Sequence, residues 1–129
     1  MWFEHLEDPR PYLNMYKEIP PLVDVRILSI TFGEGRHGIT ITFNTPTYPD
    51  FPLDKWEGCD IASMTIDFYG IRDLQISTTG HKYRGDITIE KNAEGLLEVE
   101  IKGSLNLRLV AEFGVISNMG AYVYAPDLI

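Results

Sequence analysis

The stretch DITIEKNAEGLLEVEIKGSLNLRL, residues 86–109, decides the fold class. Three short runs in it alternate between apolar and polar residues: 86–90, 97–101 and 105–109. Alternation with a period of two is typical of half-buried β-strands. Residues 92–95 (NAEG) separate the first two runs and Gly103 separates the last two, and such residues favour tight turns. The stretch therefore predicts three consecutive antiparallel strands.

The same pattern continues on both sides of this stretch. Further candidate strands lie at 22–32, 39–43, 62–68, 71–77, 110–116 and 122–124. In the first of them the apolar residues change parity after Ile27, which predicts a β-bulge or a strand buried on both faces. In the run 71–77, Leu74 and Ile76 are expected to point inward. Many short strands with turn signals between them predict an antiparallel meander sheet, closed as a sandwich, as a partly open barrel or as one strongly curved sheet.

The opening segment, residues 1–21, has a different character. Pro11 suits the first turn of a helix, and the apolar residues that follow have helical spacing, so we expect a short helix at 10–17 that packs over the sheet. Pro20-Pro21 ends it, because proline lacks the amide proton. The predicted class is α+β, mainly β. A chain of 129 residues with 44% hydrophobic residues has the size of a single domain, 1–129.

Composition narrows the functional classes. The net charge is −8, which argues against nucleic acid as a partner because phosphate binding depends on Lys and Arg. Cys59 is the only cysteine, which excludes an internal disulfide and a multi-cysteine zinc site. The N-terminus lacks the pattern of a secretory signal, and no apolar run approaches the ~20 residues that cross a bilayer. We expect a cytoplasmic protein without a membrane partner.

No motif nominates a catalytic, cofactor or metal site. His5, His37 and His81 lie far apart in the sequence, and none has a second ligand at metal-binding spacing. Acidic neighbours surround Cys59 and would make its thiol a poor nucleophile. The prediction is a protein that is not an enzyme and carries no cofactor. The alternative, an enzyme of unknown type, would have to bring His37, His81 and Asp86 together.

The segment 44–60 is the strongest candidate for a binding surface. It carries Pro46, Pro49 and Pro52, which forbid a regular ladder, and irregular loops of this length are often functional. Aromatic anchors among charged residues are typical of binding hot spots. The candidate partner-binding residues are Tyr48, Asp50, Phe51, Asp54, Trp56, Glu57 and Asp60. The competing interpretation is that Phe51 and Trp56 fold back to cap one end of the sheet.

A resemblance to a known family covers nearly the whole chain. It depends on Trp2 near the start, Asp24-Val25 at the opening of a strand, a hairpin that ends in Phe43, the proline-rich loop up to Trp56, and IDFYGIRDL at 66–74. In this order the chain resembles the bacterial immunity protein 50 family. The resemblance implies a cytoplasmic antidote that binds a cognate protein toxin and neutralises it stoichiometrically. The acidic balance is compatible with a basic toxin.

The alternative to toxin neutralisation is a β domain that binds a small molecule or a carbohydrate without catalysis. Tyr48, Trp56, Tyr69 and Tyr83 would then provide a stacking platform. A concave pocket would favour this reading, whereas an interior filled by Ile, Leu and Phe would argue against it. The oligomeric state stays open.

Overall fold

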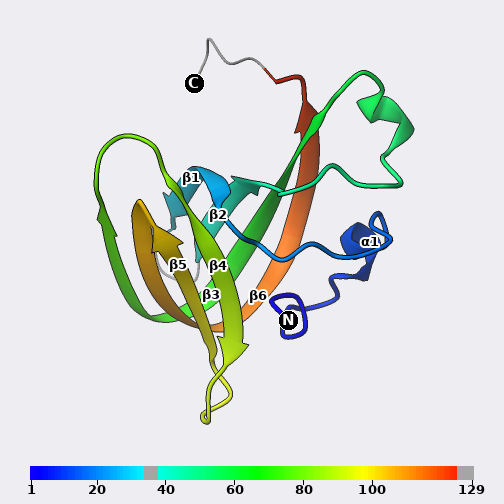
Figure 1. Ribbon diagram of the computed structural model, residues 1–129. Coiled ribbons are helices and arrows are strands. Elements are labelled where there is room, and N and C mark those ends of the chain that lie inside the picture. Colours follow the sequence, from blue (N-terminus) through cyan, green and yellow to red (C-terminus); the bar gives the residue numbers. More distant parts are fainter. Residues whose placement is uncertain (34–37, 125–129) are drawn as a thin grey trace.

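The computed structural model describes residues 1–33 and 38–124, which form six antiparallel strands and one short helix (Figure 1). The elements are α1 (Arg10–Leu13), β1 (Val25–Phe32), β2 (Ile39–Asn44), the 3-10 turn η1 (Asp54–Trp56), β3 (Ile61–Thr78), β4 (Arg84–Lys91), β5 (Leu97–Gly103) and β6 (Leu105–Tyr122). The predicted class, mainly β with a short N-terminal helix, is confirmed.

The sheet consists of two three-stranded meanders, β1-β2-β3 and β4-β5-β6, in the order β1-β2-β3-β6-β5-β4. The long strands β3 and β6 join them through a ladder that runs from Ile61↔Tyr122 to Thr78↔Leu105. At the other side β1 and β4 pair through Val25↔Gly85 and Arg26↔Arg84. We call this short ladder the seam. The sheet therefore closes on itself as an irregular barrel whose last ladder is much shorter than the others.

Three predicted strand breaks are wrong, one in β3 and two in β6. The runs 62–68 and 71–77 form one strand, β3, and the runs 105–109, 110–116 and 122–124 lie within β6 or at its end. Gly70 adopts φ +67°, and a register shift follows between Ile71 and Asp73. These features bend β3 without breaking its pairing with β6, because a bulge kinks a strand while the ladder continues on both sides.

The parity change in β1 is confirmed as a β-bulge. The register with β2 shifts between Ile27 and Ser29, so Leu28 is the extra residue. Its side chain is exposed. The bulge thus directs an apolar side chain outward at a strand whose inner face carries Val25 and Ile27, both buried.

The predicted helix 10–17 is shorter than expected. Regular α-helix ends at Leu13, and the chain then turns more tightly, with Met15 N–H donating to Tyr12 O (3.2 Å) and Tyr16 N–H to Leu13 O (3.1 Å). Bonds between residues i and i+3 are those of a 3-10 turn. The tighter winding keeps Leu13, Met15 and Tyr16 buried although the helix has ended.

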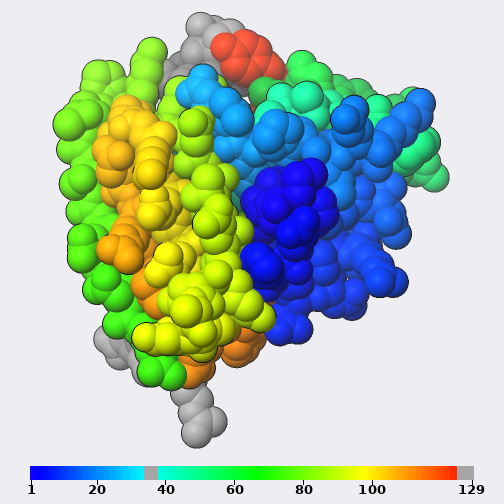
Figure 2. Space-filling model, turned by 60° about the horizontal axis from the view of Figure 1, so that its bottom comes forward, coloured from blue at the N-terminus to red at the C-terminus, as the bar shows by residue number. Residues whose placement is uncertain are grey.

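The N-terminal segment covers a gap in the barrel wall. Glu7 N–H donates to Gly114 O on β6 (2.8 Å), and Ile87 N–H on β4 donates to Leu22 O (2.8 Å). The segment therefore spans from β4 to the half of β6 that extends past β5, and Figure 2 shows it lying against β4. Trp2 and Leu6, which belong to this segment, are buried, as expected for packing over the sheet.

The barrel interior is filled by apolar side chains that alternate along the strands. The most deeply buried are Val25, Phe43, Met64, Ile66, Phe68, Ile89, Leu97, Val99, Ile101 and Leu109. This solid interior argues against a ligand held inside the barrel. The inward orientation expected for Ile76 is wrong, since 45% of its surface is exposed. The strand β3 pairs with β2 only as far as Phe68. Ile76 lies in the following half of β3, which pairs with β6.

Candidate functional site

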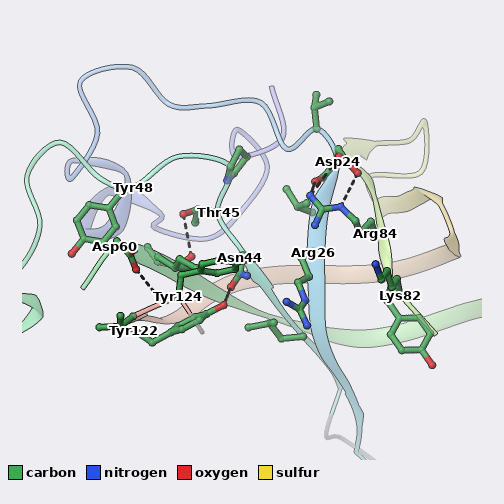
Figure 3. Close-up of a pocket in the computed structure, with 18 of the residues that line it drawn as sticks. Asp24, Arg26, Asn44, Thr45, Tyr48, Asp60, Lys82, Arg84, Tyr122 and Tyr124 are labelled. Atoms are coloured by element: carbon green, nitrogen blue, oxygen red, sulfur yellow. Dashed lines mark hydrogen bonds and ion pairs between the residues drawn. The ribbon is translucent and has the colours of Figure 1, made fainter. Parts of the chain in front are cut away.

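A groove with a volume of about 1010 Å³ lies at the end of the barrel where the seam, the β3–β4 turn and the end of β6 meet. It is lined by Val23, Asp24, Val25, Arg26, Leu28, Asn44, Thr45, Pro46, Tyr48, Asp60, Ile61, Ala62, His81, Lys82, Tyr83, Arg84, Tyr122, Val123 and Tyr124. Figure 3 shows two opposite sides, with tyrosines and Asp60 on one and basic side chains on the other. We call these the tyrosine side and the basic side.

The basic side is built on the seam. Arg84 Nε lies 3.1 Å from Asp24 Oδ1, and Arg84 Nη2 donates to the Asp24 carbonyl at 2.7 Å. Asp24 adopts φ +49° and its N–H donates to Asp86 Oδ1 at 2.8 Å. Asp24, directly before β1, therefore bonds to two residues of β4, Arg84 and Asp86. The guanidinium of Arg84 is held against the start of β1.

Ser104 holds the turn that completes the basic side. Its Oγ donates to Lys82 O (2.6 Å) and accepts from Arg84 N–H (3.0 Å), while its carbonyl accepts from Thr79 N–H (3.1 Å). A single residue between β5 and β6 thus fixes both ends of the β3–β4 turn. This turn presents His81, Lys82 and Tyr83, and all three are exposed.

The tyrosine side is built where β6 ends beside β2 and β3. Tyr122 Oη donates to Asn44 Oδ1 at 2.6 Å. Tyr124 N–H donates to Asp60 Oδ1 at 2.8 Å, and Asp60 N–H donates to Tyr122 O at 3.2 Å. These bonds hold two exposed aromatic rings against the groove. Partial burial raises the pKa of the Tyr48 phenol, and Cys59 and Asp60 raise it further, so the phenol stays a neutral hydrogen-bond donor near neutral pH.

Exposed apolar surface concentrates at this groove. Six of the twelve large hydrophobic side chains exposed in the described part of the chain line it: Val23, Leu28, Tyr83, Tyr122, Val123 and Tyr124. A local gathering of exposed aromatic and aliphatic groups with charges at its border is typical of a protein-contact surface. The groove is therefore the leading functional surface among the described residues.

The seven predicted partner-binding residues divide into three groups. Tyr48 and Asp60 line the groove. Phe51, Asp54 and Glu57 are exposed on the loop beyond it. Asp50 and Trp56 contact the rest of the molecule, Asp50 through its Oδ2, which accepts from Lys17 N–H at 2.9 Å.

Trp56 lies in the core, with only 5% of its surface exposed. Its ring lies 6.4 Å from that of Tyr48, and the loop is further tied down by Phe51 N–H donating to Met15 O (2.9 Å). The interpretation that the loop folds back is confirmed for Trp56. It does not hold for Phe51, which is 54% exposed and lies under Lys17 Nζ at 5.9 Å.

The aromatic platform expected for a small-molecule site is divided. Tyr48 and Tyr83 line the groove, Trp56 is in the core, and Tyr69 stacks on Phe113 at 5.1 Å without lining the groove. Of the group His37, His81 and Asp86, His37 lies outside the described residues, His81 lines the groove, and Asp86 accepts the Asp24 N–H. In residues 1–33 and 38–124, no group of three His, Cys, Asp or Glu is placed to hold a metal ion.

A family model described as "Immunity protein 50" matches residues 9–124. The chain belongs to this family. No curated protein and no solved structure matches it. The matched residues include every residue that lines the groove and all seven residues predicted from the loop. Among the described residues, no helix has the length and apolarity needed to cross a membrane.

In this immunity protein 50 member, the basic side of the groove was not anticipated from the sequence. Arg26, Lys82 and Arg84 come from β1, a turn and β4, and nothing in their local patterns distinguishes them from solvated surface charges. The one available signal was the parity change after Ile27, which indicated an irregularity beside Arg26.

Proposed function

We propose that this protein binds a cognate bacterial toxin in the cytoplasm and neutralises it by stoichiometric contact, without a catalytic step of its own. The observation that carries the proposal is the groove, where half of the large hydrophobic side chains exposed in the described part of the chain gather, in a chain that belongs to the immunity protein 50 family. Immunity of this kind needs a specific, stable surface, and aromatic anchors beside charges supply one.

The proposed contact surface combines the groove with the adjoining loop. Tyr48 and Asp60 belong to both, so the two form one continuous area. A standard interface buries about 800 Å² per partner, which is roughly a tenth of the 7863 Å² accessible surface. The loop acids Asp54 and Glu57 would form part of a charged rim, and the tyrosine side would form the apolar centre.

The acidic balance of the chain favours a partner with a basic face. With a net charge of −8, the protein attracts a cationic surface at long range, which raises the association rate. The toxin is then captured fast and held by the apolar contacts, which set the dissociation rate.

Coexpression with the toxin encoded beside this gene tests the proposal. Cells should survive, and the two proteins should copurify in a 1:1 ratio by size-exclusion chromatography with mass determination. A toxin that stays fully active in a purified mixture with excess of this protein would refute the proposal, because stoichiometric blockade requires that excess antidote leaves no free toxin.

The groove also supports a second candidate function, the binding of a small molecule or carbohydrate. Its volume is in the range of ligand pockets, and Tyr83, Tyr122 and Tyr124 are exposed and available for stacking on a sugar face. Titration with a panel of oligosaccharides, monitored by tyrosine fluorescence and amide chemical shifts, distinguishes the two functions. Saturable shifts confined to the groove would favour the ligand function over the toxin function.

A further inference from the structure

Two cations in the groove lack a counter-charge in the described chain. Five charged side chains line the groove: Asp24, Arg26, Asp60, Lys82 and Arg84. Arg84 forms an ion pair with Asp24, and the Asp60 carboxylate accepts a hydrogen bond from the Tyr124 N–H. Arg26 and Lys82 form no ion pair within residues 1–33 and 38–124. The groove is thus a locally basic site on a protein whose net charge is −8.

The position of Arg26 is unfavourable in the free protein. Arg26 and Arg84 are directly opposite each other across the seam, and like charges facing each other on neighbouring strands are destabilising. Asp24 relieves this repulsion for Arg84 only. Arg26 is also half-buried, and no carboxylate of the described residues forms an ion pair with its guanidinium. Figure 3 places it between the tyrosine side and Lys82.

The surroundings of Arg26 select the kind of anion. Val23 and Leu28 line the same groove and expose apolar surface there, and tyrosines line the opposite side. A polypeptide offers carboxylates together with apolar side chains. A nucleic acid offers phosphates only along a polyanion, which the net charge of the chain repels.

We propose that the groove accepts an acidic segment of a partner protein, with a carboxylate on Arg26, a second on Lys82, and apolar side chains against the tyrosine side. This inference rests on the proposed function in taking the toxin as the owner of that segment. A guanidinium binds a carboxylate through two parallel hydrogen bonds, so Arg26 would fix the register of the segment. The toxin would then present both a basic face to the loop and an acidic segment to the groove, and this mixture of signs favours specificity.

Two peptides test the groove without the toxin. The decapeptide with five Glu-Ala repeats should shift the amide signals of Arg26, Lys82 and Tyr122 saturably in ¹⁵N-labelled protein, and the matching Lys-Ala decapeptide should not. The double variant Arg26→Glu/Lys82→Glu should abolish these shifts. Arg10→Glu/Lys91→Glu changes the charge equally at exposed positions outside the groove and should preserve them. Shifts of equal size around Arg10 and Lys91, or stronger shifts with a (dT)10 oligonucleotide, would overturn the proposal.

The same variants test the toxin contact. Losing a partly buried charge pair at an interface should raise the dissociation constant at least about thirtyfold, whereas the Arg10/Lys91 control should bind as the parent does. Arg26→Glu replaces the like-charge pair of Arg26 and Arg84 across the seam by an opposite-charge pair, so it should not lower the melting temperature. A loss of binding in this variant would then not be caused by a loss of folding. If the parent binds the toxin and the groove variant binds equally well, the groove inference fails and the proposed function stands. If the parent neither binds the toxin nor protects cells, the proposed function fails. The peptide titration still tests whether the groove binds an acidic segment.

Discussion

Asp54 and Glu57 are exposed on the loop 44–60, and reversing both charges should slow toxin association without affecting stability. Neither side chain forms an ion pair within the described chain. Asp60 is left unchanged because its carboxylate accepts the Tyr124 N–H. Substitutions at exposed sites without such contacts change the free energy of unfolding by less than about 0.5 kcal/mol, so Asp54→Lys/Glu57→Lys should melt close to the parent temperature.

The size of the rate effect follows from Coulomb's law. Two unit charges about 10 Å apart in water interact by about 0.4 kcal/mol. Reversing two carboxylates changes the interaction with one facing cation by four such amounts, or about 1.6 kcal/mol before screening. With a Debye length of about 30 Å at 0.01 M salt this falls to about 1.2 kcal/mol, and with about 8 Å at 0.15 M to about 0.5 kcal/mol. The association rate constant should therefore drop about sevenfold at low salt and about twofold at physiological salt.

Stopped-flow mixing with the toxin at both salt concentrations measures this difference. The matched control is Glu90→Lys/Glu94→Lys, which makes the same charge change at exposed positions of the β4–β5 hairpin. In Figure 1 that hairpin lies at the opposite end of the barrel from the loop. Equal rate constants for the loop variant and this control would refute the reasoning, because the effect would then come from net charge and not from the loop.

Three further predictions concern the fold that carries the site. Gly103→Ala should destabilise the protein by about 1–3 kcal/mol in urea unfolding, because the new Cβ would collide with the backbone carbonyl of Arg84. Trp56→Ala should cost about 3–5 kcal/mol, and an unchanged midpoint would show that the loop does not contribute to the cooperative fold. Tyr16→Phe should cost about 1 kcal/mol through the lost hydrogen bond to Thr47 O (3.1 Å). Burial raises the pKa of Tyr16 above its ordinary value of 10.0, so the neutral phenol stabilises the fold fully below about pH 10. That contribution is lost as pH rises through the raised folded-state pKa, so the phenylalanine variant should lose less stability than the parent as the pH rises above 10.

The parts of the fold that could be predicted are those encoded by local patterns. Alternation over 86–109 predicted β4, β5 and β6 in their observed antiparallel order, and the parity change after Ile27 predicted the bulge in β1. Each signal lies within a few residues of the feature it specifies. The break expected at Gly70 was wrong because a glycine in a strand is also compatible with a bend, and the long ladder with β6 decides between the two.

The candidate site was only partly predictable, because the chain brings it together from distant segments. The loop 44–60 was visible as an unusual composition, and two of its residues, Tyr48 and Asp60, do line the groove. The basic side depends on the pairing of Arg26 with Arg84, which are 58 positions apart in the numbering. No local period reports such a contact, since it follows from barrel closure.

Barrel closure through so short a seam has a consequence for how the protein responds to a bound molecule. Among the described residues, the seam has two residue pairs, two further backbone bonds, from Ile27 N–H to Tyr83 O and from Ile87 N–H to Leu22 O, and the bonds of Asp24 to β4. Its amide protons should exchange with solvent sooner than those of the β3–β6 ladder, since fewer bonds must open. The groove crosses this seam, so a molecule held there would bridge both meanders and slow deuterium uptake at Val25 and Gly85.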